Sequence, residues 1–98
     1  MSDRPSLEPA VYTVLFYDYV DEMVQRRAPF RDAHLDHVRT AKDRGELLNA
    51  GAIGEAESAV FVFAPEADQA ARAFVSGDPY VVNDLVPTWR LTTWNVVT

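Results

Sequence analysis

The sequence predicts one α+β domain whose elements follow the order strand, helix, strand, strand, helix, strand. Four segments rich in β-branched and aromatic residues alternate in that order with two segments of helical periodicity. With 98 residues, of which 48% are hydrophobic, the chain can bury one small core but has no length for a second domain. We therefore expect a flexible leader over residues 1–9, which contain Pro5 and Pro9, and a single domain over residues 10–98.

The first half of the chain is expected to form a strand, a helix and a second strand. Residues 10–19 (AVYTVLFYDY) are dense in β-branched and aromatic side chains, which is typical of a strand. Pro29 lacks a backbone donor and has a helix-compatible φ, so we expect the continuous helix over residues 29–44. Gly45 is suited to the left-handed conformation that ends a helix, and residues 46–54 (ELLNAGAIG) then give the second strand.

The second half repeats the pattern, with a strand over residues 58–64, a helix over residues 66–75, a helical turn over residues 78–85 and a final strand over residues 87–98. Glu66 and Asp68 fall in the expected first turn of the helix, where carboxylates complement the positive end of the helix dipole. Gly77 is placed to close this helix. The two halves are therefore equivalent in element order.

This order fits a four-stranded antiparallel sheet of ferredoxin-like topology, because right-handed crossovers place both helices on a common face. The first strand nevertheless has two apolar faces, one with Leu15 and Tyr17 and the other with Tyr12, Val14 and Phe16. Large exposed apolar patches are rare on monomers, and two-fold dimers are the commonest oligomers. We therefore expect a homodimer that packs open sheet face against open sheet face.

Composition excludes several classes of partner. The formal charge is −6, the pI is near 4.7 and the nine basic residues are scattered, so we expect no nucleic-acid partner. An RNA-binding sheet, suggested by Phe61 and Phe63, lacks the usual basic residue and is the least favoured function. No apolar run approaches the ~20 residues that span a bilayer, so we expect no membrane partner. The start MSDRPSLEPA lacks the features of a secretory signal, and the chain has no Cys, so we expect a cytoplasmic protein.

Two histidines, His34 and His37, are the first candidates for chemistry, because a step of about 100° per residue places both on the helix face that meets the sheet. One interpretation is a buried histidine satisfied by a backbone carbonyl. The other is a general acid or base, because an imidazole with a pKa near ~6.5 exchanges protons at neutral pH. The two could also chelate a metal, but no third histidine exists, so we expect neither a metal site nor a cofactor.

The run Asp78-Pro79-Tyr80 has two compatible interpretations. Asp at an N-cap followed by Pro at the first helical position is the expected opening of a helical turn. Alternatively, the Asp78 carboxylate orients the His34 imidazole and fixes its tautomer, as acids do in many acid/base pairs. The sequence does not choose between these roles.

Three motifs occur in order on the expected elements: RxxHL from Arg31 to Leu35, GELLxAG from Gly45 to Gly51, and DPY from Asp78 to Tyr80. Together they resemble the YciI-like family over about residues 11–97. The resemblance implies a dimeric α/β barrel with an active-site dyad, which maps to His34 and Asp78. The family often continues AGP where this chain has Ala52 after Gly51, and this departure indicates a diverged pocket.

From these residues and the resemblance we expect a small cofactor-free enzyme of lyase or isomerase type that acts on a cyclic or aromatic metabolite. His34 would move a proton and Asp78 would orient it, while Tyr17, Arg31 and Tyr80 would contact the substrate. The alternative is a non-catalytic small-molecule-binding or accessory module that uses the same pocket.

Overall fold

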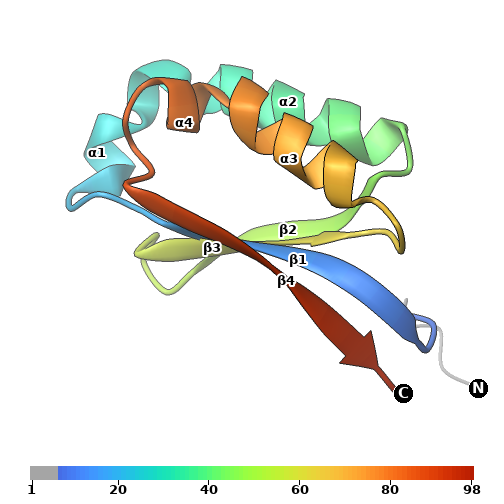
Figure 1. The fold of residues 1–98 in the computed structure, drawn as a ribbon. Helices are drawn as coiled ribbons and strands as arrows, with labels where there is room; N and C mark the ends of the chain where they lie inside the picture. The colour runs from blue at the N-terminus through green and yellow to red at the C-terminus, as the bar shows by residue number, and fades with distance from the viewer. Residues whose placement is uncertain (1–6) are drawn as a thin grey trace, which may run out of the picture.

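The computed structural model describes residues 7–98, whose strands form one antiparallel four-stranded sheet beneath a layer of helices (Figure 1). The strands are β1 (Ala10–Asp18), β2 (Leu47–Ile53), β3 (Ser58–Phe63) and β4 (Thr88–Val96), in the spatial order β2-β3-β1-β4. This arrangement confirms the ferredoxin-like α+β fold expected from the element order. The leader expected over residues 1–9 falls largely on residues 1–6, which lie outside the described residues.

The helical layer contains α1 (Met23–Arg26), the 3₁₀ turn η1 (Ala28–Phe30), α2 (Arg31–Asp43), α3 (Asp68–Gly77) and α4 (Pro79–Val82). Gly45 follows α2 with a φ of 76°, as the expected helix end requires. Within residues 7–98, every helix is too short or too polar to cross a bilayer.

Two helix starts differ from the sequence expectation. The helix expected from Pro29 begins with the tighter η1 turn, and regular α2 follows from Arg31. The helix expected from Glu66 begins at Asp68, because Glu66 has a left-handed φ of 65° that a right-handed helix cannot include. Only Asp68 of the two expected acidic residues therefore lies in the first turn of α3.

The core lies between the sheet and helices α2 and α3. Leu15 and Tyr17 of β1 and Phe63 of β3 are fully buried there, and Phe61 and Phe74 pack beside them. The rings of Tyr17 and Phe61 have centroids 4.7 Å apart, and those of Phe61 and Phe74 are 5.2 Å apart. Successive side chains of a strand point to opposite faces, so β1 directs Leu15 and Tyr17 into this core, while Tyr12 and Val14 are buried on the other face.

The opposite face of the sheet carries no helix in the described chain (Figure 1). A hollow of about 360 Å³ opens on this face and is lined by Val14, Phe16, Val60, Val62, Thr92, Thr93 and Trp94. The Trp94 side chain is 47% exposed, and the Arg90 guanidinium stacks 4.2 Å from the centroid of the Phe16 ring. The second apolar face that the first strand predicted is therefore present, but Tyr12 and Val14 are only 4% exposed on it, whereas Phe16 is partly exposed and Trp94 is the most exposed large side chain of the hollow.

Candidate functional site

The imidazole of His34 and the carboxylate of Asp78 form a buried pair. His34 comes from the first half of α2, and Asp78 lies at the junction of α3 and α4. The distance between His34 Nδ1 and Asp78 Oδ1 is 2.7 Å. Asp78 is 0% exposed and His34 is 6% exposed, so little water competes for this hydrogen bond.

Asp78 also caps the short helix α4. Its Oδ1 accepts a hydrogen bond of 3.0 Å from the backbone N–H of Tyr80, and Pro79 occupies the first helical position. The two roles left open by the sequence thus coexist, because one carboxylate oxygen accepts from both His34 and the Tyr80 backbone. The cap hydrogen bond holds the Asp78 carboxylate in the position where it contacts the His34 imidazole of α2.

Tyr17 supplies the third donor to Asp78. Its hydroxyl donates to Asp78 Oδ2 over 2.7 Å, across 61 positions in sequence. Burial, reinforced by the nearby Asp78 carboxylate, raises the pKa of Tyr17 far above its usual value, so the phenol stays protonated and remains a donor. Tyr17 is 0% exposed and lies behind the pair instead of on the cavity wall, unlike the substrate contact expected from the sequence.

The second ring nitrogen of His34 is the group left for chemistry. A proton on Nδ1 faces Asp78, so neutral His34 carries its lone pair on Nε2. The ring stacks parallel to Tyr80, with centroids 3.8 Å apart and an interplanar angle of 6°. Nε2 has no hydrogen-bond partner among residues 7–98. It is also not fully buried, because the Tyr80 hydroxyl is the only fully buried side-chain polar atom without a partner in this part of the chain. His34 Nε2 therefore has access to the cavity that His34 lines.

This cavity, which we call the arginine cavity, has a volume of about 260 Å³. Its polar walls are Tyr19, Arg27, Arg31, His34 and Tyr80. Its apolar walls include Leu35, Val38, Ala50, Ala52, Ala59 and Phe61. The small side chains of β2 leave the space open, and a cavity of about 150 Å³ already accepts one benzene ring. The arginine cavity can therefore hold a single substituted ring beside His34.

The two expected contacts Arg31 and Tyr80 both line the arginine cavity, and Arg27 lines it with them. Sequence reasoning missed Arg27. Arg27 and Arg31 are four positions apart, a spacing that brings side chains together on a helix. The helix was expected to begin only at Pro29, so this spacing was not applied to Arg27. Neither arginine has a carboxylate within 4.0 Å among residues 7–98.

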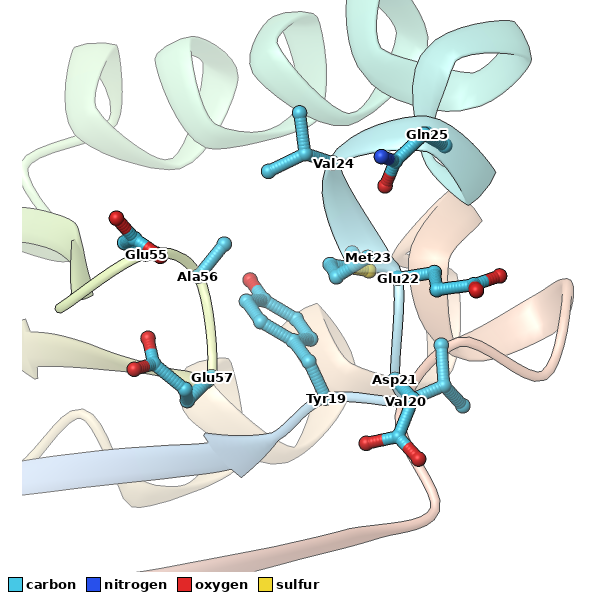
Figure 2. A pocket seen from close by; sticks show the side chains of 10 residues that line it. All are labelled: Tyr19, Val20, Asp21, Glu22, Met23, Val24, Gln25, Glu55, Ala56 and Glu57. Carbon is cyan, nitrogen blue, oxygen red and sulfur yellow. The ribbon is translucent and has the colours of Figure 1, made fainter.

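Tyr19 also borders a second hollow of about 620 Å³ at the end of β1 (Figure 2). Figure 2 shows the Tyr19 ring standing between the loop of Glu55 to Glu57 and helix α1. The four carboxylates of this hollow, from Asp21, Glu22, Glu55 and Glu57, are exposed. Burial, reinforced by Asp78, raises the pKa of Tyr19 well above its usual value. With its four exposed carboxylates the second hollow is acidic and open, whereas the arginine cavity has two guanidinium groups on its wall.

His37 has the structural role considered above for either histidine, a hydrogen bond to a backbone carbonyl. Its Nε2 lies 2.8 Å from the backbone carbonyl oxygen of Phe74 on α3, and its ring packs against the Phe74 ring with centroids 4.4 Å apart. The imidazole contacts α3 and not the sheet face expected from helical periodicity. His34 and His37 are thus held by different partners, and no group of three or more His, Asp or Glu side chains is gathered for a metal within residues 7–98.

Comparison with known proteins identifies the fold. No protein-family model matches the chain, and no curated protein sequence matches it. A similar solved structure is 5-chloro-2-hydroxyhydroquinone dehydrochlorinase from Burkholderia phenoliruptrix, in complex with 2,5-dihydroxybenzoquinone, with a TM-score of 0.70 and 15% identity over 85% of this chain and 92% of that one. An antibiotic biosynthesis monooxygenase superposes with a TM-score of 0.56 and 9% identity over 91% of this chain and 100% of that one.

A NIPSNAP family protein with unknown function from Agrobacterium tumefaciens gives a TM-score of 0.54 and 14% identity over 88% of this chain and 86% of that one. At these identities the comparisons show the fold alone, a ferredoxin-like α+β fold with a four-stranded antiparallel sheet. No family model supports the narrower resemblance to the YciI-like family.

Proposed function

We propose that this protein is a YciI-like, cofactor-free enzyme that moves a proton on a small cyclic or aromatic metabolite, with His34 as the acid/base and Asp78 as its orienting partner. The observation that carries the proposal is the 2.7 Å contact between His34 Nδ1 and Asp78 Oδ1. This contact leaves the other imidazole nitrogen available to the arginine cavity. In catalytic triads a buried carboxylate likewise holds the general-base imidazole in one tautomer and stabilises its protonated form.

The chemistry follows from that arrangement. Neutral His34 takes a proton at Nε2 from a substrate carbon next to a carbonyl, and the electron pair of the broken C–H bond stays on the substrate as an enolate. The Asp78 carboxylate stabilises the imidazolium, and Tyr17 holds the carboxylate in place. Return of the proton to another atom gives isomerase chemistry. Lyase chemistry results when the enolate pair forms a C=C double bond and a leaving group departs from the neighbouring carbon with the electrons of its own bond.

The size of the arginine cavity supports a ring-shaped substrate. Its volume of about 260 Å³ exceeds what one benzene ring needs. The dehydrochlorinase of the same fold was solved with a small ring compound, 2,5-dihydroxybenzoquinone. That ligand belongs to a protein of 15% identity, so it guides the choice of compounds to test and not the reaction.

A proton-transfer assay tests the role of His34 before the product is known. We expect that a cyclic ketone or quinone turned over by the protein exchanges a C–H proton for deuterium in D₂O, as followed by NMR. His34→Gln should lower the exchange rate by about 10²- to 10⁴-fold, which is the usual contribution of general acid/base catalysis. His37→Gln is the matched control, because His37 contacts the Phe74 carbonyl and does not line the arginine cavity, so its exchange rate should stay near wild type.

The same assay separates the enzyme from a binding module. Saturable ligand binding with no exchange in the wild type, unchanged by His34→Gln, would contradict the catalytic proposal and favour the non-catalytic module.

We also propose that the protein is a homodimer whose two copies pack through the open sheet face. The hollow of about 360 Å³ with largely apolar walls, and the half-exposed Trp94 beside it, support this arrangement. Sheet-against-sheet packing would remove both from water.

A charge placed on this face should dissociate the dimer. Light scattering at micromolar concentration should give a dimer for the wild type and a monomer for Trp94→Lys. Trp94 is 47% exposed in the single chain, so its loss leaves the core intact. Trp89→Lys is the matched control, because Trp89 is 40% exposed on the same strand but pairs with Tyr17 on the helix-covered side. A monomeric wild type would contradict the proposed dimer.

A further inference from the structure

We infer that the arginine cavity binds an anionic oxygen of its ligand, a carboxylate or a phenolate on a planar ring, through Arg27, Arg31 and the Tyr80 hydroxyl. This inference names the substrate class of the proposed function and rests on the same cavity. It adds a recognition site to the proton-transfer pair.

Two positive charges without partners are the first observation. Arg27 is half-buried and Arg31 is exposed at the wall of the cavity, and neither has a carboxylate within 4.0 Å among residues 7–98. The chain as a whole carries a formal charge of −6, so carboxylates are abundant elsewhere on it. Two guanidinium groups left uncompensated at one cavity are the groups that bind carboxylate or phenolate oxygens best.

The Tyr80 hydroxyl is the second, independent observation. Tyr80 is 1% exposed and lines the cavity, yet its hydroxyl is the only fully buried side-chain polar atom within residues 7–98 that lacks a hydrogen-bond partner. Leaving a buried donor unpaired costs about 1–3 kcal/mol, so a bound ligand that accepts this hydrogen bond would remove an unfavourable term. An anionic oxygen between the arginines would accept this hydrogen bond.

The protonation of Tyr80 suits that role. Burial raises the pKa of the Tyr80 phenol, and the positive charges of Arg27 and Arg31 oppose the rise only in part. The phenol therefore remains a donor at neutral pH, and all three side chains line the same cavity.

The geometry also connects this site to the proposed chemistry. The imidazole of His34 stacks on the Tyr80 ring at 3.8 Å, so a ligand whose anionic oxygen meets Tyr80 and Arg31 has its ring beside His34. The neighbouring hollow, with four exposed carboxylates, repels an anion and leaves the arginine cavity as the favourable place for it.

Paired probes of equal shape and different charge test the inference. Benzoate should bind at least about tenfold more tightly than benzamide in isothermal titration calorimetry, and 4-nitrophenolate should likewise bind more tightly than 4-nitroaniline, in which a neutral amino group replaces the phenolate oxygen. The two pairs distinguish a carboxylate from a phenolate preference. Raised salt should weaken the binding of the anions and not that of the neutral compounds.

Variants assign the binding to these side chains. Arg31→Gln should weaken benzoate binding by about tenfold, which corresponds to the lower end of the range measured for hydrogen bonds to charged groups. Arg26→Gln is the matched control, because Arg26 is exposed, precedes Arg27 and lines none of the described cavities, so its affinity should equal that of the wild type. Tyr80→Phe should weaken benzoate binding by about two- to tenfold without lowering the melting temperature, since the hydroxyl has no hydrogen-bond partner among residues 7–98.

Equal affinities for benzoate and benzamide, no detectable binding of either anion, or an Arg31→Gln variant that binds like Arg26→Gln would overturn the inference. None of these results depends on deuterium exchange. Proton exchange together with a preference for neutral rings would support the His34 proposal and contradict the anion site. Tight anion binding without proton exchange would support the anion site and contradict the His34 proposal.

Discussion

Asp78→Asn should lower the rate of the proton transfer proposed for His34 by about 10²- to 10⁴-fold while the protein stays folded. Asn keeps an oxygen that can accept from the Tyr80 backbone N–H and from His34 Nδ1, so the N-cap survives. The charge that stabilises the imidazolium is lost, however, and the amide presents N–H donors to the Tyr17 hydroxyl, which must then accept. The deuterium exchange rate of the substrate, measured beside thermal unfolding, reports both effects.

Asp36→Asn is the control for this change. Asp36 lies on the same helix as His34, is exposed, and forms a surface ion pair with Arg39 at 3.1 Å. Such pairs contribute about 0.3–0.5 kcal/mol, so neither rate nor stability should move noticeably. If Asp78→Asn and Asp36→Asn both retained the wild-type rate, Asp78 would be a helix cap with no part in catalysis.

Phe61→Ala should lower the free energy of unfolding by about 3–5 kcal/mol, which is a large share of the 5–15 kcal/mol typical of a small domain. Phe61 is 2% exposed, and its ring lies among those of Tyr17, Phe74 and His34, at centroid distances of 4.7, 5.2 and 6.4 Å. Its removal therefore leaves a cavity under the His34–Asp78 pair. The melting temperature should fall by more than about 10 °C in calorimetry.

Val82→Ala provides the comparison for Phe61→Ala. Val82 is 65% exposed on α4, so the loss of its methyl groups should change the free energy of unfolding by less than about 0.5 kcal/mol. A loss below 1 kcal/mol for Phe61→Ala would contradict the close packing of rings around the site.

The sequence contained more of the fold than of the site. Alternation along β1 and the proline and glycine positions gave the strands and the helix ends, and the left-handed Gly45 is observed as expected. The start of α3 was wrong because Glu66, an ordinary residue, adopts a left-handed φ that no residue pattern announces. The motifs made His34, Asp78, Arg31 and Tyr80 candidates, and the structure places His34, Arg31 and Tyr80 at the arginine cavity with Asp78 in contact with His34. Arg27 lines the same cavity and was not a candidate.

The roles of these residues needed the path of the chain. Helical periodicity placed His34 and His37 on one face, but only packing gave His34 a buried carboxylate and His37 the Phe74 carbonyl. Tyr17 looked like a pocket residue by type, yet register puts its hydroxyl behind the pair, on Asp78.

By itself, then, the sequence determined the element order, the two apolar faces of β1 and the residue types available for acid/base chemistry, because periodicity and backbone propensity act between near neighbours. The tertiary structure alone decided that Tyr17, His34 and Asp78 meet, across separations of 61 and 44 residues to Asp78. It also decided that two arginines and the Tyr80 hydroxyl share one cavity. Contacts between residues so far apart depend on how the sheet and helices pack, and a pattern of near neighbours does not encode that packing.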